Sequence, residues 1–187
     1  MKNRTGDLLI QIISVTVGVF LGFIISSWSE NRRVTRKHNI ILEAIEAEIQ
    51  ANRDKVKDVI DYHVLVRDST KHYLAKANSG KNDLSYFKGI NTITFENSAY
   101  QTGIQSGLFG TNSLKKIQAI NDIYTKQRSY EDFTILMLSG LISMDFEETK
   151  KSTRKITTFL SIGMTDVVIK EQDLLKSYDT ALDIIQE

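Results

Sequence analysis

The chain has 187 residues, of which 41% are hydrophobic and 25% are charged, and its formal net charge is +1. This composition is that of an ordinary globular protein with room for one compact domain and an appendage, and it excludes a disordered chain. The absence of cysteine excludes disulfides and thiolate metal sites, and the near-neutral charge excludes the global basic field that drives non-specific nucleic-acid binding.

A stretch without any charged side chain, residues 8–28, follows a short tail of residues 1–7. At 1.5 Å per residue it is long enough to cross the hydrocarbon core of about 30 Å of a bilayer, and Trp28 lies where an interfacial aromatic is expected. A cleaved signal peptide is the alternative. The length of the stretch and the lack of a small-residue cleavage site after it favour a retained transmembrane helix over residues 8–28.

Cations flank this stretch and predict its orientation. Those that follow it are Arg32, Arg33, Arg36 and Lys37, whereas Lys2, Arg4 and the terminal amine precede it. Because cytoplasmic flanks carry an excess of Lys and Arg, the larger following set favours a cytoplasmic location for the rest of the chain. We assign Trp28 and the four following cations to the membrane interface.

Small residues recur on one face of the expected membrane helix. Ser14, Gly18, Gly22 and Ser26 follow each other at intervals of four, and Gln11 extends the same face. Small side chains at i and i+4 let helix backbones approach closely in lipid, so this face predicts homo-oligomerisation. Since Gln11 and Ser14 are also tolerated beside water, the face can either line a pore in a ring of helices or seal a closed bundle, and the sequence leaves both open.

Residues 29–187 are expected to form one helical soluble domain. Core-type residues spaced alternately by three and four predict a long helix over about residues 29–77, which can be continuous with the membrane helix, and the absence of proline favours it. His63 on this seam is expected to be a hydrogen-bonded core histidine. The seam consists of Leu42, Ile45, Ile49, Asn52, Val56, Val59, His63, Val66, Thr70, Tyr73 and Ala77.

The remaining chain predicts a surface loop over residues 80–91 and three further helices. A short helix spans residues 95–106, and the next one begins after Asn112, a plausible N-cap, and continues to Met144. Its apolar residues 133–144 are expected to form a buried core helix, not a second membrane span, because the run has about a dozen residues and Ser139 and Gly140 interrupt it. The last helix covers about residues 153–185. The expected fold is all-α: a single transmembrane helix that continues into a long-helix bundle of about four helices.

Few residues are candidates for catalysis. The chain lacks the glycine-rich phosphate-binding, α/β-hydrolase and zinc-protease motifs, and it has three histidines. Asp68 and His72, at i and i+4, make half of a metal site, but no second pair at ligand spacing accompanies them. We therefore expect neither a metal nor a small-molecule cofactor.

One arginine-histidine motif remains. Arg67 and His72 are separated by four residues, and Arg33 and His38 have the same spacing. This resembles the R-x(4–6)-H signature of HEPN domains, helical-bundle ribonucleases, and the resemblance implies that Arg67 and His72 act on RNA without a metal. On an unbroken helix the two side chains point about 140° apart, so they share a site only if the helix bends or a partner chain contributes. We expect the motif to be degenerate and to consist of ordinary surface charge.

The anchor, the helical bundle and the Arg67–His72 motif together resemble the membrane accessory proteins of type VI-B CRISPR systems. This resemblance implies a HEPN-like protein of the bacterial inner membrane that forms a homo-oligomeric pore and enhances antiviral defence by an RNA-guided nuclease. The partners it implies are further copies of the chain, the lipid bilayer, and that nuclease or its RNA products. A single-pass scaffold or sensor whose bundle binds a partner protein is the alternative.

A second resemblance is local. Residues 28–32, the triplet 98–100, Ser106 with Gly107, and residues 114–124 are similar to a family of uncharacterised bacterial single-pass membrane proteins. That family implies no activity. Both resemblances can hold, because an accessory protein can be recruited from such a family.

Overall fold

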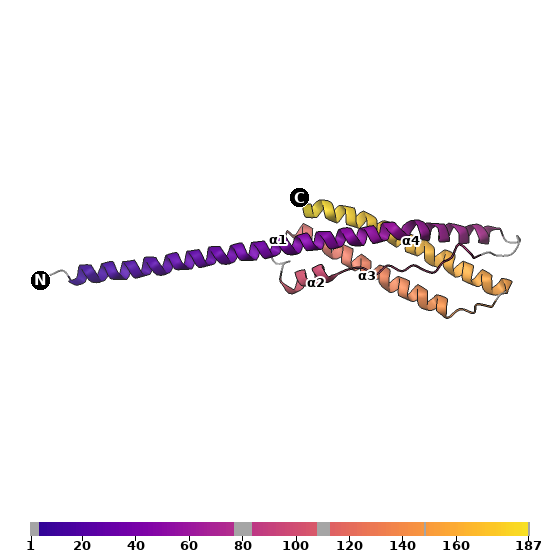
Figure 1. The fold of residues 1–187 in the computed structure, drawn as a ribbon, viewed down its shortest axis with the longest axis horizontal. Helices are drawn as coiled ribbons and strands as arrows, with labels where there is room; N and C mark the ends of the chain where they lie inside the picture. The colour runs from indigo at the N-terminus through magenta and orange to yellow at the C-terminus, as the bar shows by residue number, and fades with distance from the viewer. Residues whose placement is uncertain (1–3, 77–83, 108–112, 148, 187) are drawn as a thin grey trace. The chain divides into compact units, whose positions relative to one another are not determined.

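The protein is described by a computed structural model that covers residues 4–76, 84–107, 113–147 and 149–186 (Figure 1). Over these residues it contains four α-helices and no strand: α1 (Arg4–Ala75), α2 (Ser98–Gln105), α3 (Leu114–Ile142) and α4 (Lys150–Gln186). The predicted all-α fold is therefore confirmed. The chain divides into two compact units, Met1–Glu43 and Ala44–Glu187.

Helix α1 runs without interruption from Arg4 to Ala75, so the apolar stretch and the long amphipathic segment belong to one helix. No proline breaks it, and its interior glycines, Gly18 and Gly22, lie within the apolar part. The helix ends close to the predicted position, although Ala77 and Gly80 lie outside the described residues.

Within the second unit, the predicted seam of α1 forms one wall of the core. Its fully buried members are Ile45, Ile49, Asn52, Val56, His63, Val66 and Thr70. Lys57, on the opposite face, is exposed. The three-four spacing thus identified the buried face of α1 correctly, because residues at these intervals share one side of a helix.

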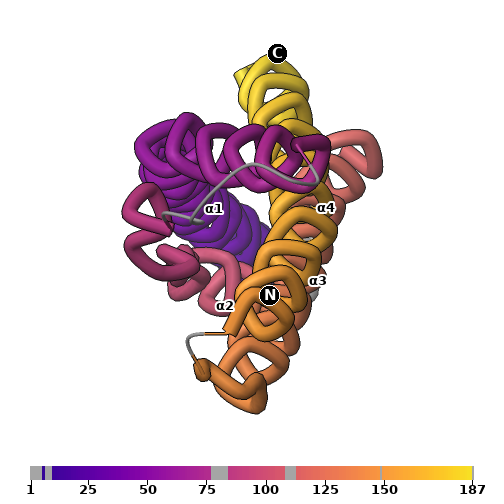
Figure 2. Tube along the Cα trace, turned by 90° about the vertical axis from the view of Figure 1, so that its right-hand side faces the viewer, coloured from indigo at the N-terminus to yellow at the C-terminus, as the bar shows by residue number. Residues whose placement is uncertain are grey.

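Helices α3 and α4 lie side by side and antiparallel (Figures 1 and 2). Two glycines allow side chains of one helix to pack tightly against the other. A β-carbon at Gly163 would lie 2.7 Å from Cε of Met137, and one at Gly140 would lie 2.9 Å from the ring of Phe159. Gly140 lies inside the unbroken helix α3, where it gives the ring of Phe159 space against the helix.

The apolar residues 133–144 differ from the expectation of a buried core helix. Only one face is buried, with Thr134, Met137 and Leu141 packed inside. The exposed side chains are Ile135, Leu136, Leu138 and Ile142. The run is apolar on more than its core face, which periodicity alone did not reveal.

The connection before α2 is a packed strap and not a surface loop. From Leu84 to Asn97 the chain has no regular element, yet Ile90, Ile93 and Phe95 are buried. The residues 80–83 of the expected loop lie outside the described residues. Helix α2 begins at Ser98, three residues later than predicted, because residues 95–97 belong to the strap.

The starts of α3 and α4 also differ slightly from the prediction. Ser113 is the N-cap of α3, and its side chain accepts a hydrogen bond from the backbone N–H of Lys116. Asn112, the expected cap, lies outside the described residues. Helix α4 begins at Lys150, three residues earlier than predicted.

Candidate functional site

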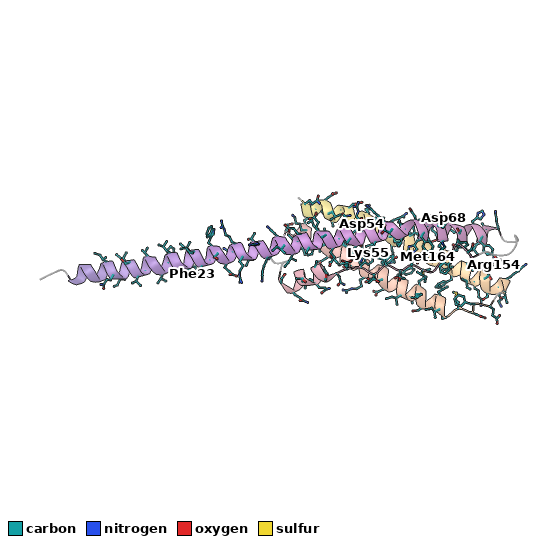
Figure 3. All side chains as sticks on the ribbon, viewed as in Figure 1. Phe23, Asp54, Lys55, Asp68, Arg154 and Met164 are labelled. Atoms are coloured by element: carbon teal, nitrogen blue, oxygen red, sulfur yellow. The ribbon has the colours of Figure 1, made fainter. Side chains whose placement is uncertain are left out.

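The N-terminal part of α1 exposes a continuous apolar surface. Its most apolar window of 18 residues has a mean hydropathy of 2.1, and none of that window is buried. Phe23, which projects freely from the helix in Figure 3, is 70% exposed. The chain thus has one N-terminal helix that is long and apolar enough to cross a membrane, a property that membrane spans share with signal sequences.

The small residues expected to mediate assembly lie on this helix and are open. Gln11, Ser14 and Ser26 are exposed, and apart from the adjacent residues and the backbone of the same helix no atom lies within 4 Å of a β-carbon placed at Gly18 or Gly22. The space in front of both glycines is sufficient for the backbone of another helix to approach.

The residues assigned to the membrane interface occupy the next turns of α1. The guanidinium of Arg32 stacks on the ring of Trp28, 3.9 Å from its centroid. Arg33 instead donates two hydrogen bonds to Glu30, at 2.8 and 3.1 Å, and this pairing holds the pKa of the Glu30 carboxyl below its usual value. Arg36 and Lys37 are exposed. Arg33 is therefore paired with a carboxylate, whereas Arg32 lies on an aromatic ring and Arg36 is exposed.

A groove of about 610 Å³ follows one face of α1 at this level. It is lined by Trp28, Asn31, Arg32, Thr35, Arg36, Asn39, Ile40 and Glu43. Arg33 and Lys37 are not among its lining residues.

The arginine-histidine candidates lie near the end of α1. Arg67 donates a hydrogen bond from Nε to Asp68 at 2.7 Å, which raises the pKa of Arg67 and lowers that of Asp68. His72 is exposed in the last turn of the helix. Because α1 is unbroken here, their directions differ by about 140°, and no hydrogen bond joins them in the part of the chain that the structure describes. A joint site still requires a second chain. In the other motif, Arg33 is paired with Glu30.

Sequence reasoning missed a buried polar cluster between α1, α3 and α4. Oε1 of Glu171 is 2.6 Å from Nδ1 of His63 and accepts a hydrogen bond from the hydroxyl of Tyr130 at 2.9 Å. Nε2 of His63 donates to the backbone carbonyl of Ile90 at 2.8 Å. All three side chains have no exposed surface, so His63 is a hydrogen-bonded core histidine, as predicted.

A second buried carboxylate caps α2. Glu48 on α1 accepts hydrogen bonds from the backbone N–H groups of Ala99 and Tyr100 and from the hydroxyl of Tyr124 at 2.5 Å. A carboxylate stabilises a helix N-terminus because the first N–H groups there lack intrahelical partners. Burial, with the added effect of Glu48, raises the pKa of Tyr124 far above its usual value.

The sequence did contain a signal for both carboxylates. Glu171 falls on the core register of α4, four residues after Val167 and three before Leu174, and Glu48 adjoins the core residue Ile49. An acidic residue at such a position is rarely buried unless it is paired. Both carboxylates are buried and bond to structural partners, although Oε2 of Glu171 has no hydrogen-bond partner among the described residues. We assign both to the core and not to catalysis.

Among the residues that the structure describes, no group of three or more His, Asp or Glu side chains is placed to hold a metal ion. Comparison with protein-family models, with curated protein sequences and with solved structures finds no match to this chain.

Proposed function

We propose that this chain is a single-pass protein of the bacterial cytoplasmic membrane that assembles with copies of itself through the face of Gln11, Ser14, Gly18, Gly22 and Ser26. The observation that carries this proposal is the complete exposure of an apolar helix whose glycines face open space. In water such a surface would be unstable; in a bilayer the apolar face is solvated by lipid and the small face allows backbone contact.

The proposed activity of the assembly is that of a pore. Gln11 and Ser14 supply polar groups on the face that would meet in a ring of helices, and a polar face in the membrane is stable only against other polar groups or water. The resemblance to type VI-B accessory proteins supplies the biological setting, an antiviral effector that acts with an RNA-guided nuclease on the cytoplasmic side. The bundle would then be the part that senses the nuclease or its RNA products.

Leakage of a trapped dye from liposomes tests the pore. Full-length protein reconstituted at increasing protein-to-lipid ratio should release the dye with a steeper than linear dependence on protein, because a ring needs several copies. Release should be lost in Gln11→Leu/Ser14→Ala, which removes the polar lining and keeps position 14 small, so that the helices can still approach each other. An oligomer that never leaks, alone or with the nuclease, contradicts the pore.

One observation favours the alternative, a scaffold whose bundle binds a partner protein. The face of α3 with Ile135, Leu138 and Ile142 is exposed and apolar, as protein-binding surfaces often are. Ile135→Glu/Ile142→Glu should leave dye release intact if the pore proposal is right. Loss of biological activity in this variant, together with a wild-type protein that releases no dye, would favour the scaffold.

A further inference from the structure

The turns of α1 after Trp28 combine a groove with unpaired cations. Between Asn31 and Leu42 the chain has four cations, Arg32, Arg33, Arg36 and Lys37, and no carboxylate. Arg33 is neutralised by Glu30, whereas Arg32 and Arg36 line the groove together with Trp28. Glu43 also lines the groove, at the end far from Trp28, so the lining side chains have a formal net charge of +1 and the two arginines lie nearer to Trp28.

The geometry of Arg32 suits an anion with two adjacent oxygens, such as a phosphate group. Its guanidinium lies on the indole of Trp28, so the face of the guanidinium is covered while its N–H groups, which lie in the guanidinium plane, remain available at the edge. A guanidinium held in this way is preorganised to donate two parallel hydrogen bonds to phosphate oxygens. Arg36 lies one helical turn further along the same groove and provides a second charge.

The position of the groove along the helix matches the level of the lipid phosphates in a membrane. At 1.5 Å per residue, Arg32 and Arg36 lie roughly 6 and 12 Å along the helix from Trp28. The polar headgroup layer extends about 5–8 Å beyond each side of the hydrocarbon core, so Arg32 lies at the level of the lipid phosphates when Trp28 lies at the interface. Soluble anions have no such preference for this level.

We propose that Trp28, Arg32 and Arg36 form a binding site for the phosphate headgroup of an anionic phospholipid. Trp28 packs against the glycerol and upper acyl region, and Arg32 chelates the phosphate. The α-carbon of Arg36 lies beyond the headgroup layer, and its long side chain, directed toward the helix N-terminus, reaches back to the outer phosphate oxygens. This inference depends on the proposed membrane span, but it does not depend on self-association or on a pore.

Native mass spectrometry of the full-length protein released from detergent micelles measures the site directly. The probes are phosphatidylglycerol, phosphatidylcholine of the same acyl chains, and soluble glycerol 3-phosphate. The protein should retain phosphatidylglycerol in preference to phosphatidylcholine, and glycerol 3-phosphate at the same concentration should not displace it. Displacement by glycerol 3-phosphate would show that the site takes a free phosphate and would overturn the assignment to lipid.

Neighbouring residues provide matched variants. Each basic residue near an anionic surface strengthens binding by roughly fivefold, so Arg32→Gln/Arg36→Gln should reduce the affinity for phosphatidylglycerol by about 25-fold. Arg36→Gln alone should cost about fivefold, whereas Lys37→Gln, the same loss of charge one residue away but outside the groove, should cost less than about twofold. Equal losses at residues 36 and 37 would mean diffuse attraction and contradict a groove site.

The same spectra separate this proposal from the proposed function. A monomer that retains phosphatidylglycerol selectively supports the lipid site and contradicts self-association. An oligomer that retains both lipids equally supports self-association and contradicts the lipid site.

Discussion

Nδ1 of His63 lies 2.6 Å from Oε1 of Glu171, and the two residues, 108 positions apart in the chain, have no exposed surface. The carbonyl of Ile90 can only accept a hydrogen bond, so Nε2 of His63 carries a proton. One further proton occupies the contact with Glu171. The pair is therefore neutral as a whole, whichever partner holds that proton, and it joins α1, α4 and the strap without leaving a net charge in the core.

His63→Ala should strongly destabilise the bundle. The substitution leaves the buried carboxylate of Glu171 without its main partner, and breaking one side of a buried pair costs about 3–5 kcal/mol in the free energy of unfolding. His72→Ala, at the exposed end of the same helix, should change that free energy by less than about 0.5 kcal/mol. Urea unfolding of the full-length protein in detergent, followed by circular dichroism, measures both. Similar values for the two variants would contradict the role of the pair.

A charge on the seam should prevent folding of the bundle. Ile49 has no exposed surface, and Ile49→Asp places an uncompensated carboxylate among apolar side chains. Lys57→Asp on the exposed face of α1 should be tolerated, although it changes the charge by two. Resistance to limited proteolysis distinguishes the two proteins. If both variants were equally sensitive, the assignment of the buried face would be wrong.

Alkaline pH should destabilise the bundle through three tyrosines. Burial raises the pKa of Tyr124, Tyr130 and Tyr178 far above the ordinary value of 10.0. The unfolded chain therefore loses these protons more readily than the folded one, so the stabilisation is complete below about pH 10 and decreases as the pH rises beyond it.

Absorbance of tyrosinate near 295 nm tests this dependence. The chain has seven tyrosines, and these three should ionise only together with the loss of helical circular dichroism. Tyr124→Phe keeps the ring but removes one ionisable group, so it should reduce the absorbance change that accompanies unfolding by about one third. Ionisation of all seven tyrosines before unfolding would refute the expectation.

Gly18→Leu/Gly22→Leu should weaken assembly without affecting insertion. The added side chains fill the open space in front of both glycines and separate the backbones, while they make the span more apolar. Val15→Leu/Val19→Leu is the matched control, since it enlarges exposed residues that alternate with the small face. Energy transfer between labelled copies in liposomes reports the association. Unchanged transfer in the glycine variant would place the contacts in the bundle.

Purified protein should not cleave single-stranded RNA in the presence of EDTA. Arg67 is engaged by Asp68, and the helical geometry directs His72 elsewhere, so one chain does not assemble the acid-base pair. Arg67→Gln and His72→Ala should therefore leave the background of RNA degradation unchanged. Metal-independent cleavage that disappears in His72→Ala would establish a ribonuclease formed between chains.

The helices could be predicted from local sequence patterns, because helix formation depends on residues within a few turns of each other. The three-four spacing of Ile45, Ile49 and Val56 identified one side of α1, and the absence of proline favoured its unbroken length. The strap could not be predicted in the same way. Its order depends on distant partners, such as Asn52, whose side chain accepts from the N–H of Glu96 at 2.9 Å and donates to its carbonyl at 2.7 Å.

The candidate site was predictable to a similar extent. The apolar stretch, the small face and the cations are visible in the sequence. The sequence does not show that Arg32 stacks on Trp28 while Arg33 pairs with Glu30, because this depends on the side-chain rotamers of the two arginines. The pairing of His63 with Glu171 lies beyond any local pattern, since it joins two helices that are far apart in the chain.

Gln186 donates a hydrogen bond to Glu46, 140 positions earlier, so the end of α4 packs near the first turns of the seam and can do so only after it has been synthesised. The seam of α1 stays uncovered until α4 has left the ribosome, at 5–20 residues per second roughly 10 to 30 seconds after the apolar stretch has emerged. If the apolar stretch is a membrane span, as proposed, its insertion therefore precedes closure of the bundle. During this interval the exposed seam is a target for chaperones and for misassembly with neighbouring nascent chains, so a slower rate of translation after residue 75 would lower the yield of correctly folded protein.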